Sequence, residues 1–318
     1  MGVILVTSRS FDTGRAKVQS QLMEAGHTVI RGDPHHHLDA LREALSSADA
    51  WIAGTGRIEA AHLAIAPRLQ IIARYGVGVD AVDRYALASH GVLLTNTPGA
   101  NSDAVADHAL GLMLALLRGT LAADRRVRRG DWSASAGREL GGMTVGIVGY
   151  GRIGQGVARR LRGFGARFIA VDPFLDPSTV TDTELVDEPL EIARRCDLVS
   201  LHSPGGAVIV DERWLTEARP GMLVVNTARG DLIDESAVAE ALRRNHLAGF
   251  AADALAGEHA NTPSPLLDAD LADRVILTPH LGAQTTDAID KMSIGAAQSV
   301  LDALAGRSPA HLIAPGGS

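Results

Sequence analysis

The sequence has few cysteines, few aromatic residues and no excess of positive charge, and each of these shortages excludes a class of site or partner. Its one cysteine, Cys196, excludes an internal disulfide framework and a multi-cysteine zinc site. That thiol precedes an apolar run, so it is expected to be packed and inert. Aromatic residues make up 3 % of the chain, and its net charge is -7. Nucleic-acid binding usually needs a basic face, so nucleic acid is not an expected partner.

Long apolar runs are also missing. The opening MGVILVTSRS lacks the basic segment and the apolar core of a secretory signal peptide. The longest apolar run, ALGLMLALL at residues 109–117, is about half as long as a membrane span. We therefore expect a soluble, cytoplasmic protein with no membrane partner.

What the sequence does contain is an alternation of short β-branched runs and helical patterns. With 318 residues and 46 % apolar content, two domains are expected. The alternation predicts parallel βαβ units and an α/β fold of two doubly wound sheets. The predicted strands of the first series are residues 3–7, 51–54, 69–74 and 91–96. The six of the second series begin at residues 144, 167, 198, 222, 248 and 274.

Two polar clusters receive ordinary interpretations. A long helix is expected over residues 102–118, and the following DRRVRRGDW (124–132) is interpreted as a solvated helix end. The segment GDWSASAGRELGG (130–142) is interpreted as a connector. The triplet at His35–His37 is interpreted as a solvated turn, and no metal site is expected.

A glycine motif opens the second series. It follows the strand at 144–148 and begins a helix, as a dinucleotide-binding loop requires. Its first glycine permits a tight turn, its second lets the backbone approach a pyrophosphate, and its third allows close packing of helix and strand. The motif consists of Gly149, Tyr150, Gly151, Arg152, Ile153 and Gly154.

An acidic residue then indicates the cofactor. Asp172 ends the next strand, RFIAVD. A carboxylate there accepts hydrogen bonds from ribose hydroxyls and repels a 2′-phosphate, so NAD is favoured over NADP. Arg152 leaves some tolerance for NADP.

Three chemically active residues follow other strands of this series. Arg229, Glu258 and His280 come after MLVVN, AGFAAD and RVILT. Ligands of doubly wound sheets bind at the carboxyl ends of strands, so the three side chains are expected near the cofactor. An arginine binds a carboxylate and a carbonyl oxygen, a histidine transfers the proton, and a glutamate orients the imidazole. Each residue could instead be an ordinary surface loop residue.

Six stretches in a fixed order carry a resemblance. They are ARYGVGVDAVD, TNTPGANSDAVADHALGLMLAL, GGMTVGIVGYGRIGQGVARRLRGFG, RPGMLVVNTARGDLIDESAVAEAL, AADALAGE and ILTPHLGAQT. The chain resembles the D-isomer-specific 2-hydroxyacid dehydrogenase family over nearly its whole length. The resemblance implies an NAD-dependent enzyme that interconverts a D-2-hydroxy acid and its 2-oxo acid.

The resemblance also implies the role of each site residue. Arg229 would bind and polarise the 2-oxo acid, with His280 as general acid/base and Glu258 as its partner. The N–H groups of Val77 and Gly78 would bind the substrate carboxylate. The remaining implied contacts are cofactor contacts of Pro204, Thr227, Ala228 and Asp253, the last of these holding the nicotinamide carboxamide.

The implied architecture is split. Residues 1–98 and 284–318 would form a flavodoxin-like substrate domain, and residues 99–283 an inserted Rossmann domain for NAD. Hinges are expected near residues 96–99 and 278–282, and the resemblance also implies a homodimer built on the NAD domain.

Some positions depart from the family. The sequence after Glu258 lacks an acidic-proline pair, and the loop after LHSP is short. Gly54 stands where phosphoglycerate enzymes tend to have an arginine, and Arg57 comes only later. A short acid such as glyoxylate or hydroxypyruvate is therefore favoured, with 3-phosphoglycerate as an alternative. An NAD(H)-sensing dimeric scaffold is the alternative of another class.

Overall fold

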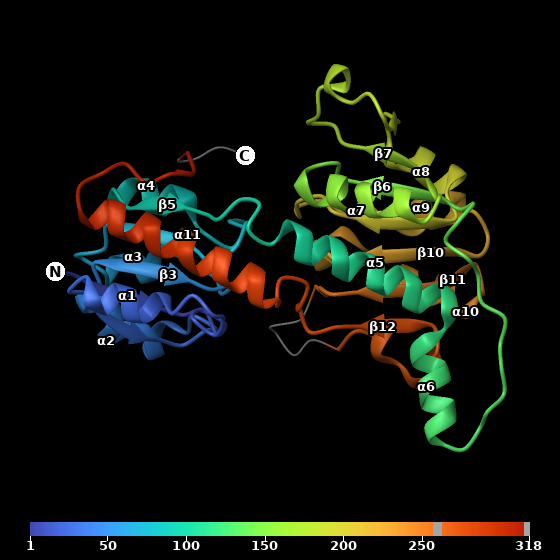
Figure 1. Ribbon diagram of the computed structural model, residues 1–318, viewed down its shortest axis with the longest axis horizontal. Helices are drawn as coiled ribbons and strands as arrows, with labels where there is room; N and C mark the ends of the chain where they lie inside the picture. The colour runs from blue at the N-terminus through green and yellow to red at the C-terminus, as the bar shows by residue number, and fades with distance from the viewer. Residues whose placement is uncertain (257–262, 315–318) are drawn as a thin grey trace. The chain divides into compact units, whose positions relative to one another are not determined.

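The computed structural model describes residues 1–256 and 263–314 (Figure 1). It divides into two compact units, which we call unit 1 (Met1–Asn101 with Ala283–Ser318) and unit 2 (Ser102–Gly282). The predicted division at residues 98/99 and 283/284 lies close to these bounds. Each unit holds a parallel sheet with helices on its faces, so the predicted fold class is confirmed.

Unit 1 has a sheet in the order β2-β1-β3-β4-β5, which is the flavodoxin-like order. Four of these strands were predicted. The missed strand, β2, lies at the sheet edge and has exposed ends, so it lacks a continuous apolar run. The bounds are β1 Val3–Val6, β2 Thr28–Arg31, β3 Ala50–Ala53, β4 Ile71–Arg74 and β5 Leu93–Thr95.

Helices cover both faces of this sheet because successive strand residues point to opposite sides. Ile4 and Val6 pack with α1 and α11, while Leu5 packs with α2, α3 and α4. The C-terminal helix α11 crosses the sheet of unit 1 (Figure 1). The bounds are α1 Val18–Glu24, α2 Leu38–Ser47, α3 Ala60–Ala64, α4 Arg84–His90 and α11 Thr286–Leu304.

The chain after α11 protects an edge of the same sheet. Leu312 forms an antiparallel bridge with Thr95, and the N–H of Ile313 donates to the carbonyl of Leu94 at 2.8 Å. Part of the open edge of strand β5, at Leu94 and Thr95, is thereby paired.

Unit 2 has a sheet in the order β12-β11-β10-β9-β6-β7-β8. Counted within the unit this is 3-2-1-4-5-6 with one more strand, the dinucleotide-binding order. All six predicted strands are present, and the missed β8 has two residues at the edge. The bounds are β6 Thr144–Val148, β7 Arg167–Val171, β8 Glu184–Leu185, β9 Leu198–Leu201, β10 Met222–Asn226, β11 Leu247–Ala252 and β12 Val275–Leu277.

Two buried clusters fill unit 2. Helices α5 and α7 pack on one face of its sheet, and α8, α9 and α10 on the other. The helix bounds are α5 Ser102–Arg118, α6 Thr120–Arg128, α7 Arg152–Gly163, α8 Pro189–Arg195, α9 Glu212–Glu217 and α10 Glu235–Arg243. The 3-10 turns are η1 Pro177–Thr179, η2 Gly230–Leu232, η3 Pro265–Leu267 and η4 Ala269–Leu271.

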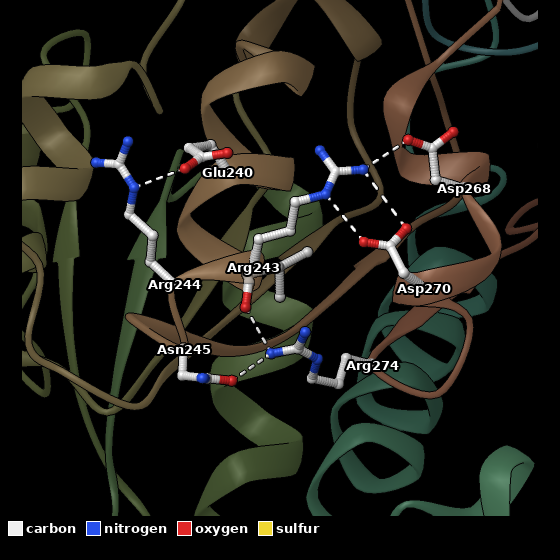
Figure 2. A network of polar contacts seen from close by, with 8 residues as sticks. Glu240, Arg243, Arg244, Asn245, Asp268, Asp270 and Arg274 are labelled. Atoms are coloured by element: carbon white, nitrogen blue, oxygen red, sulfur yellow. Dashed lines mark hydrogen bonds and ion pairs between the residues drawn. The ribbon is translucent and has the colours of Figure 1, made fainter.

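Arginines tie η3 and η4 to α10 (Figure 2). The Arg243 guanidinium donates to Asp268 at 2.6 Å and to Asp270 at 2.9 Å, and Arg274 donates to the side chain of Asn245 at 2.7 Å. The segment that returns from β11 to β12 is therefore fastened at the end that enters β12.

Several minor predictions can be compared with the structure. The long helix is present as α5, the basic cluster ends α6, and residues 131–139 form no helix or strand. Cys196 is buried, and burial raises the pKa of its thiol to about 12. The solvated turn is wrong for His36, which is 4 % exposed.

No single helix in residues 1–256 and 263–314 is long and apolar enough to cross a membrane. The bent pair α5–α6 meets the length and composition criteria only when its two helices are taken together.

Candidate active site

The glycine motif forms the turn between β6 and α7. Gly149 has φ +89°, and a Cβ there would lie 2.6 Å from the amide nitrogen of Ser203, so a side chain is excluded. A Cβ at Gly154 would lie 2.1 Å from the Gly149 carbonyl oxygen. At Gly151 a Cβ would meet no atom within 4 Å. The first and third glycines are therefore needed for packing, while the backbone at the second faces open space.

Helix α7 begins at the next residue, Arg152. The first N–H groups of an α-helix have no acceptor within the helix, and they form the positive end of its dipole. Both features favour an anion at this turn. The side chain of Tyr150 points into the protein instead, where its hydroxyl bonds Thr183 at 2.5 Å.

Asp172 directly follows β7 and faces this turn. Its Oδ2 accepts the N–H of Tyr150 at 2.8 Å, and its Oδ1 accepts the N–H of Phe174 at 3.0 Å. A carboxylate offers about four acceptor positions, so these two bonds fix its orientation and leave capacity for further donors.

The short loop after β9, which contains Pro204, is held by a residue that the sequence reasoning missed. The N–H of Gly206 donates to the Asp231 carboxylate at 2.8 Å, and a Cβ at Gly205 would lie 2.6 Å from it. Two consecutive glycines were the available signal, because they permit this close approach of a carboxylate.

His202 lies beneath the loop after β10. Its Nε2 bonds Ser200 at 2.9 Å, and its Nδ1 lies 3.5 Å from the Thr227 hydroxyl. Burial lowers the pKa of His202 to about 3, so its imidazole is neutral. This histidine therefore supports the loop and is not a proton donor at neutral pH.

Asn226 fixes the backbone that carries Arg229. The side chain of this fully buried residue donates to the Arg229 carbonyl at 2.8 Å and accepts the N–H of Ala228 at 3.0 Å. The sequence reasoning missed it, although an amide at the end of an apolar strand was a signal. Arg229 also donates to the Ala228 carbonyl at 2.9 Å.

Asp253, at the end of β11, holds the loop that carries His280. Its two oxygens accept the N–H groups of Leu281 at 2.9 Å and Gly282 at 2.7 Å, and the Thr278 hydroxyl donates to it at 2.5 Å. The backbone of His280 has φ +51°, which is uncommon outside glycine. The network therefore fixes an otherwise unfavourable loop conformation.

The ionised form of Asp253 is favoured. Burial acts to raise the pKa of this carboxyl, but the hydrogen bonds from His108, Thr278 and the loop amides outweigh it and lower the pKa. The His108 ring lies 3.4 Å from the carboxylate and 3.0 Å from the Thr278 hydroxyl.

The predicted residues of unit 2 gather at one sheet edge. Arg229, Asp253 and His280 follow β10, β11 and β12, which are neighbours in the sheet, and the glycine turn and Asp172 follow β6 and β7. Glu258 lies outside the described residues. In the part of the chain that the structure describes, no group of three or more metal-binding side chains is present.

Val77 and Gly78 lie in unit 1, in the loop after β4. The Val77 carbonyl accepts from Asn96 at 2.8 Å, and the Gly78 carbonyl accepts from Arg74 at 3.1 Å. These bonds fix the loop backbone.

Comparisons with known proteins agree on one family. The profile of the NAD binding domain of the D-isomer specific 2-hydroxyacid dehydrogenases matches residues 110–282. D-3-phosphoglycerate dehydrogenase of Mycobacterium tuberculosis is 41 % identical over 286 residues, 88 % of this chain and 53 % of that protein. The chain thus spans about half the length of this relative.

Two other proteins match over most of their length. Glyoxylate reductase of Thermococcus litoralis is 34 % identical over 275 residues, which cover 81 % of each chain. The TT0316 protein from Thermus thermophilus, known from a crystal structure, is 33 % identical, with a TM-score of 0.88 over 98 % of this chain and 100 % of that one.

Proposed function

Because the chain belongs to the D-isomer specific 2-hydroxyacid dehydrogenase family, we propose that it interconverts a D-2-hydroxy acid and its 2-oxo acid with NAD. The observation that carries the proposal is the gathering of Arg229, Asp253 and His280 at the sheet edge that also bears the glycine turn. When bound, the cofactor supplies or accepts the hydride.

The residues of unit 2 suit NAD. The open backbone at Gly151 and the start of α7 would receive the pyrophosphate, with Tyr150, Arg152 and Ile153 in the same turn. Asp172 would accept hydrogen bonds from the ribose hydroxyls. The other proposed cofactor contacts are Pro204, Thr227, Ala228 and Asp253.

The proposed chemistry uses three side chains. Arg229 binds the substrate carboxylate and the neighbouring oxygen, and its positive charge polarises the carbonyl. His280 protonates that oxygen during reduction and accepts the hydroxyl proton during oxidation. Glu258 orients and stabilises the imidazolium. In unit 1, the N–H groups of Val77 and Gly78 would bind the substrate carboxylate.

The domain roles form part of the proposal. Residues 1–98 and 284–318 would bind the substrate, and residues 99–283 would bind NAD. Bending near residues 96–99 and 278–282 would exclude water from the path of the hydride.

The proposal also includes a homodimer located in the cytoplasm. Leu121 and Val127 on α6 are each 40 % exposed, and Trp132 in the following connector is 80 % exposed. Figure 1 shows α6 and the connector extending from the sheet of unit 2. A second copy that covers these apolar side chains would remove them from water. A cytoplasmic location suits a reaction that depends on a freely exchanging nicotinamide cofactor.

Two alternatives have specific support. The 41 % identity to a D-3-phosphoglycerate dehydrogenase favours 3-phosphoglycerate as substrate, and exposed Arg57 provides one cation for its phosphate. An NAD(H)-sensing dimeric scaffold would use the same cofactor loop and the exposed apolar residues of α6 without turnover.

The test follows NADH oxidation with glyoxylate, hydroxypyruvate and 3-phosphohydroxypyruvate, using the wild-type protein and His280→Asn. Asparagine tolerates the left-handed backbone at this position, so the variant should fold. We expect kcat to fall by about 10²- to 10⁴-fold while NADH binding persists, because only the proton-transfer group is lost.

Either of two results would contradict the proposal. One is turnover that survives in His280→Asn. The other is a wild-type protein that binds NADH but reduces none of these acids, a result that would favour the sensing scaffold.

A further inference from the structure

A buried histidine in unit 1 has no place in the proposed chemistry. His36 lies in the turn between β2 and α2, is 4 % exposed and has φ +61°. Its neighbours His35 and His37 are exposed. Burying a polar ring in an uncommon backbone conformation is costly, so the contacts of this ring must compensate.

The hydrogen bonds of the ring define its tautomer. Nδ1 lies 3.2 Å from the carbonyl oxygen of Arg57, which can only accept, so Nδ1 carries the proton. Nε2 must then accept the hydroxyl proton of Thr7 at 2.7 Å. The Thr7 oxygen in turn accepts the indole N–H of Trp51 at 2.9 Å and the N–H of Gly54 at 3.2 Å.

The electrostatics agree with a neutral ring. Burial and the nearby Arg74 charge lower the pKa of His36 to about 4. At neutral pH the ring therefore keeps one donor and one acceptor, and both are used.

These bonds all lead to one loop, residues 54–58, which we call the substrate loop. The network holds its backbone at Gly54 and Arg57, and Arg74 donates to the carbonyls of Gly54 and Gly56. A Cβ at Gly56 would lie 2.5 Å from the His36 ring, so the loop rests directly on the imidazole.

The same arginine links this loop to the proposed carboxylate site. The Nε of Arg74 donates to the carbonyl of Gly78 at 3.1 Å. The side chains of Thr55 and Arg57 remain exposed on the outer side of the loop.

We propose that His36 is a positioning residue for the substrate: its neutral ring and Thr7 hold the substrate loop so that Thr55 and Arg57 face the substituent of the 2-oxo acid. The inference rests on the proposed function, because it assigns to this loop the discrimination between different 2-oxo acid substrates. A loop held in advance loses less conformational entropy when the acid binds, so loosening it should weaken substrate binding in particular.

The test compares Thr7→Val with Thr7→Ser. Valine has nearly the same shape but leaves the His36 ring, the Trp51 indole N–H and the N–H of Gly54 without their partner, whereas serine keeps the hydroxyl. Three buried hydrogen bonds are lost, and two of them, to His36 and Gly54, hold the substrate loop. We expect Thr7→Val to raise KM for the preferred 2-oxo acid by about tenfold. The kcat and the NADH dissociation constant should stay within about twofold, and Thr7→Ser should restore KM.

A second pair of variants guards against a general folding defect. His36→Asn should act like Thr7→Val, because asparagine accepts the left-handed backbone but cannot reach both partners. His35→Ala, in the same turn and exposed, should leave KM unchanged. Equal KM values for Thr7→Val, His36→Asn and the wild type would overturn the proposal.

Hydrogen–deuterium exchange provides a measurement that needs no activity. Peptides covering residues 54–59 should exchange faster in Thr7→Val than in the wild type, while peptides from unit 2 should not change. Unchanged exchange in this loop would overturn the inference even if the enzyme is active. If the loop exchanges faster in Thr7→Val but the wild-type protein shows no turnover, the proposed function and the substrate role are both refuted, and only the structural contact stands.

Discussion

At the residue scale, the clearest finding is that polar side chains with no proposed role in proton transfer hold the backbone next to the proposed catalytic residues. Asn226 bonds both Ala228 and Arg229, and Asp253 bonds the two amides after His280. The reactive types and their order along the chain were visible in the sequence. Their supports are also polar residues at strand ends, but the backbone groups that these residues bond are known only from the structure.

We expect Asn226→Ala to affect substrate binding more than cofactor binding. The buried variant would leave the Ala228 N–H and the Arg229 carbonyl without partners, at a cost of about 1–3 kcal/mol. KM for the 2-oxo acid should rise at least about tenfold as Arg229 loses its fixed position. Steady-state kinetics and thermal melting would measure this, with the exposed His35→Ala as control. An unchanged KM would show that Asn226 only supports folding.

At the scale of elements, the turn from β6 to α7 separates two uses of glycine. Gly154 must lack a side chain because helix and turn touch, while Gly151 lacks one where the space is open. The sequence motif predicts both positions, but only the folded structure distinguishes a packing requirement from a binding requirement.

Matched alanine substitutions make this distinction measurable. Gly151→Ala meets no atom within 4 Å and has φ -73°, so its melting temperature should match that of the wild type. Its NADH affinity should fall by about tenfold or more because the Cβ stands where the pyrophosphate would approach. Gly154→Ala, which would meet the Gly149 carbonyl at 2.1 Å, should lower the melting temperature. Normal NADH affinity in Gly151→Ala would refute the proposed phosphate site.

At the scale of the whole molecule, each unit contains a histidine that its surroundings keep neutral, the buried His36 in unit 1 and the half-buried His202 in unit 2. Burial lowers both pKa values, to about 4 and about 3, from an ordinary value of 6.5. Between the lowered and the ordinary pKa, the unfolded chain therefore binds protons on these two imidazoles, and the folded chain does not. The part of the unfolding free energy that depends on these two histidines should be fully present above about pH 6.5. It should be lost as the pH falls from about 6.5 toward 4.

The expected contribution of His36 is on the order of 2 kcal/mol at about pH 5. Urea unfolding at about pH 7 and pH 5 would measure it, with His36→Asn as the comparison. The wild type should lose more stability between the two pH values than the variant loses. Equal losses would mean that the His36 ring is protonated in the folded protein as readily as in the unfolded chain.

The sequence alone determined the fold class, most strands and the order of the reactive residues. Apolar runs, glycine motifs and strand-end residues are local features, and their physical causes act over a few neighbouring positions. The strands it missed, β2 and β8, lie at sheet edges, where partial burial leaves a weak apolar pattern.

Only the tertiary structure decided which polar residues hold the site together. His36 looked like part of a solvated turn, yet it lies beneath residues 54–58 because Thr7, Trp51 and Arg57 meet around it. Asp231 likewise accepts the N–H of Gly206 in another loop. Asn226 donates to the carbonyl of Arg229 across a turn of the backbone. Such bonds depend on distances between atoms that folding brings together, and a linear pattern does not encode those distances directly.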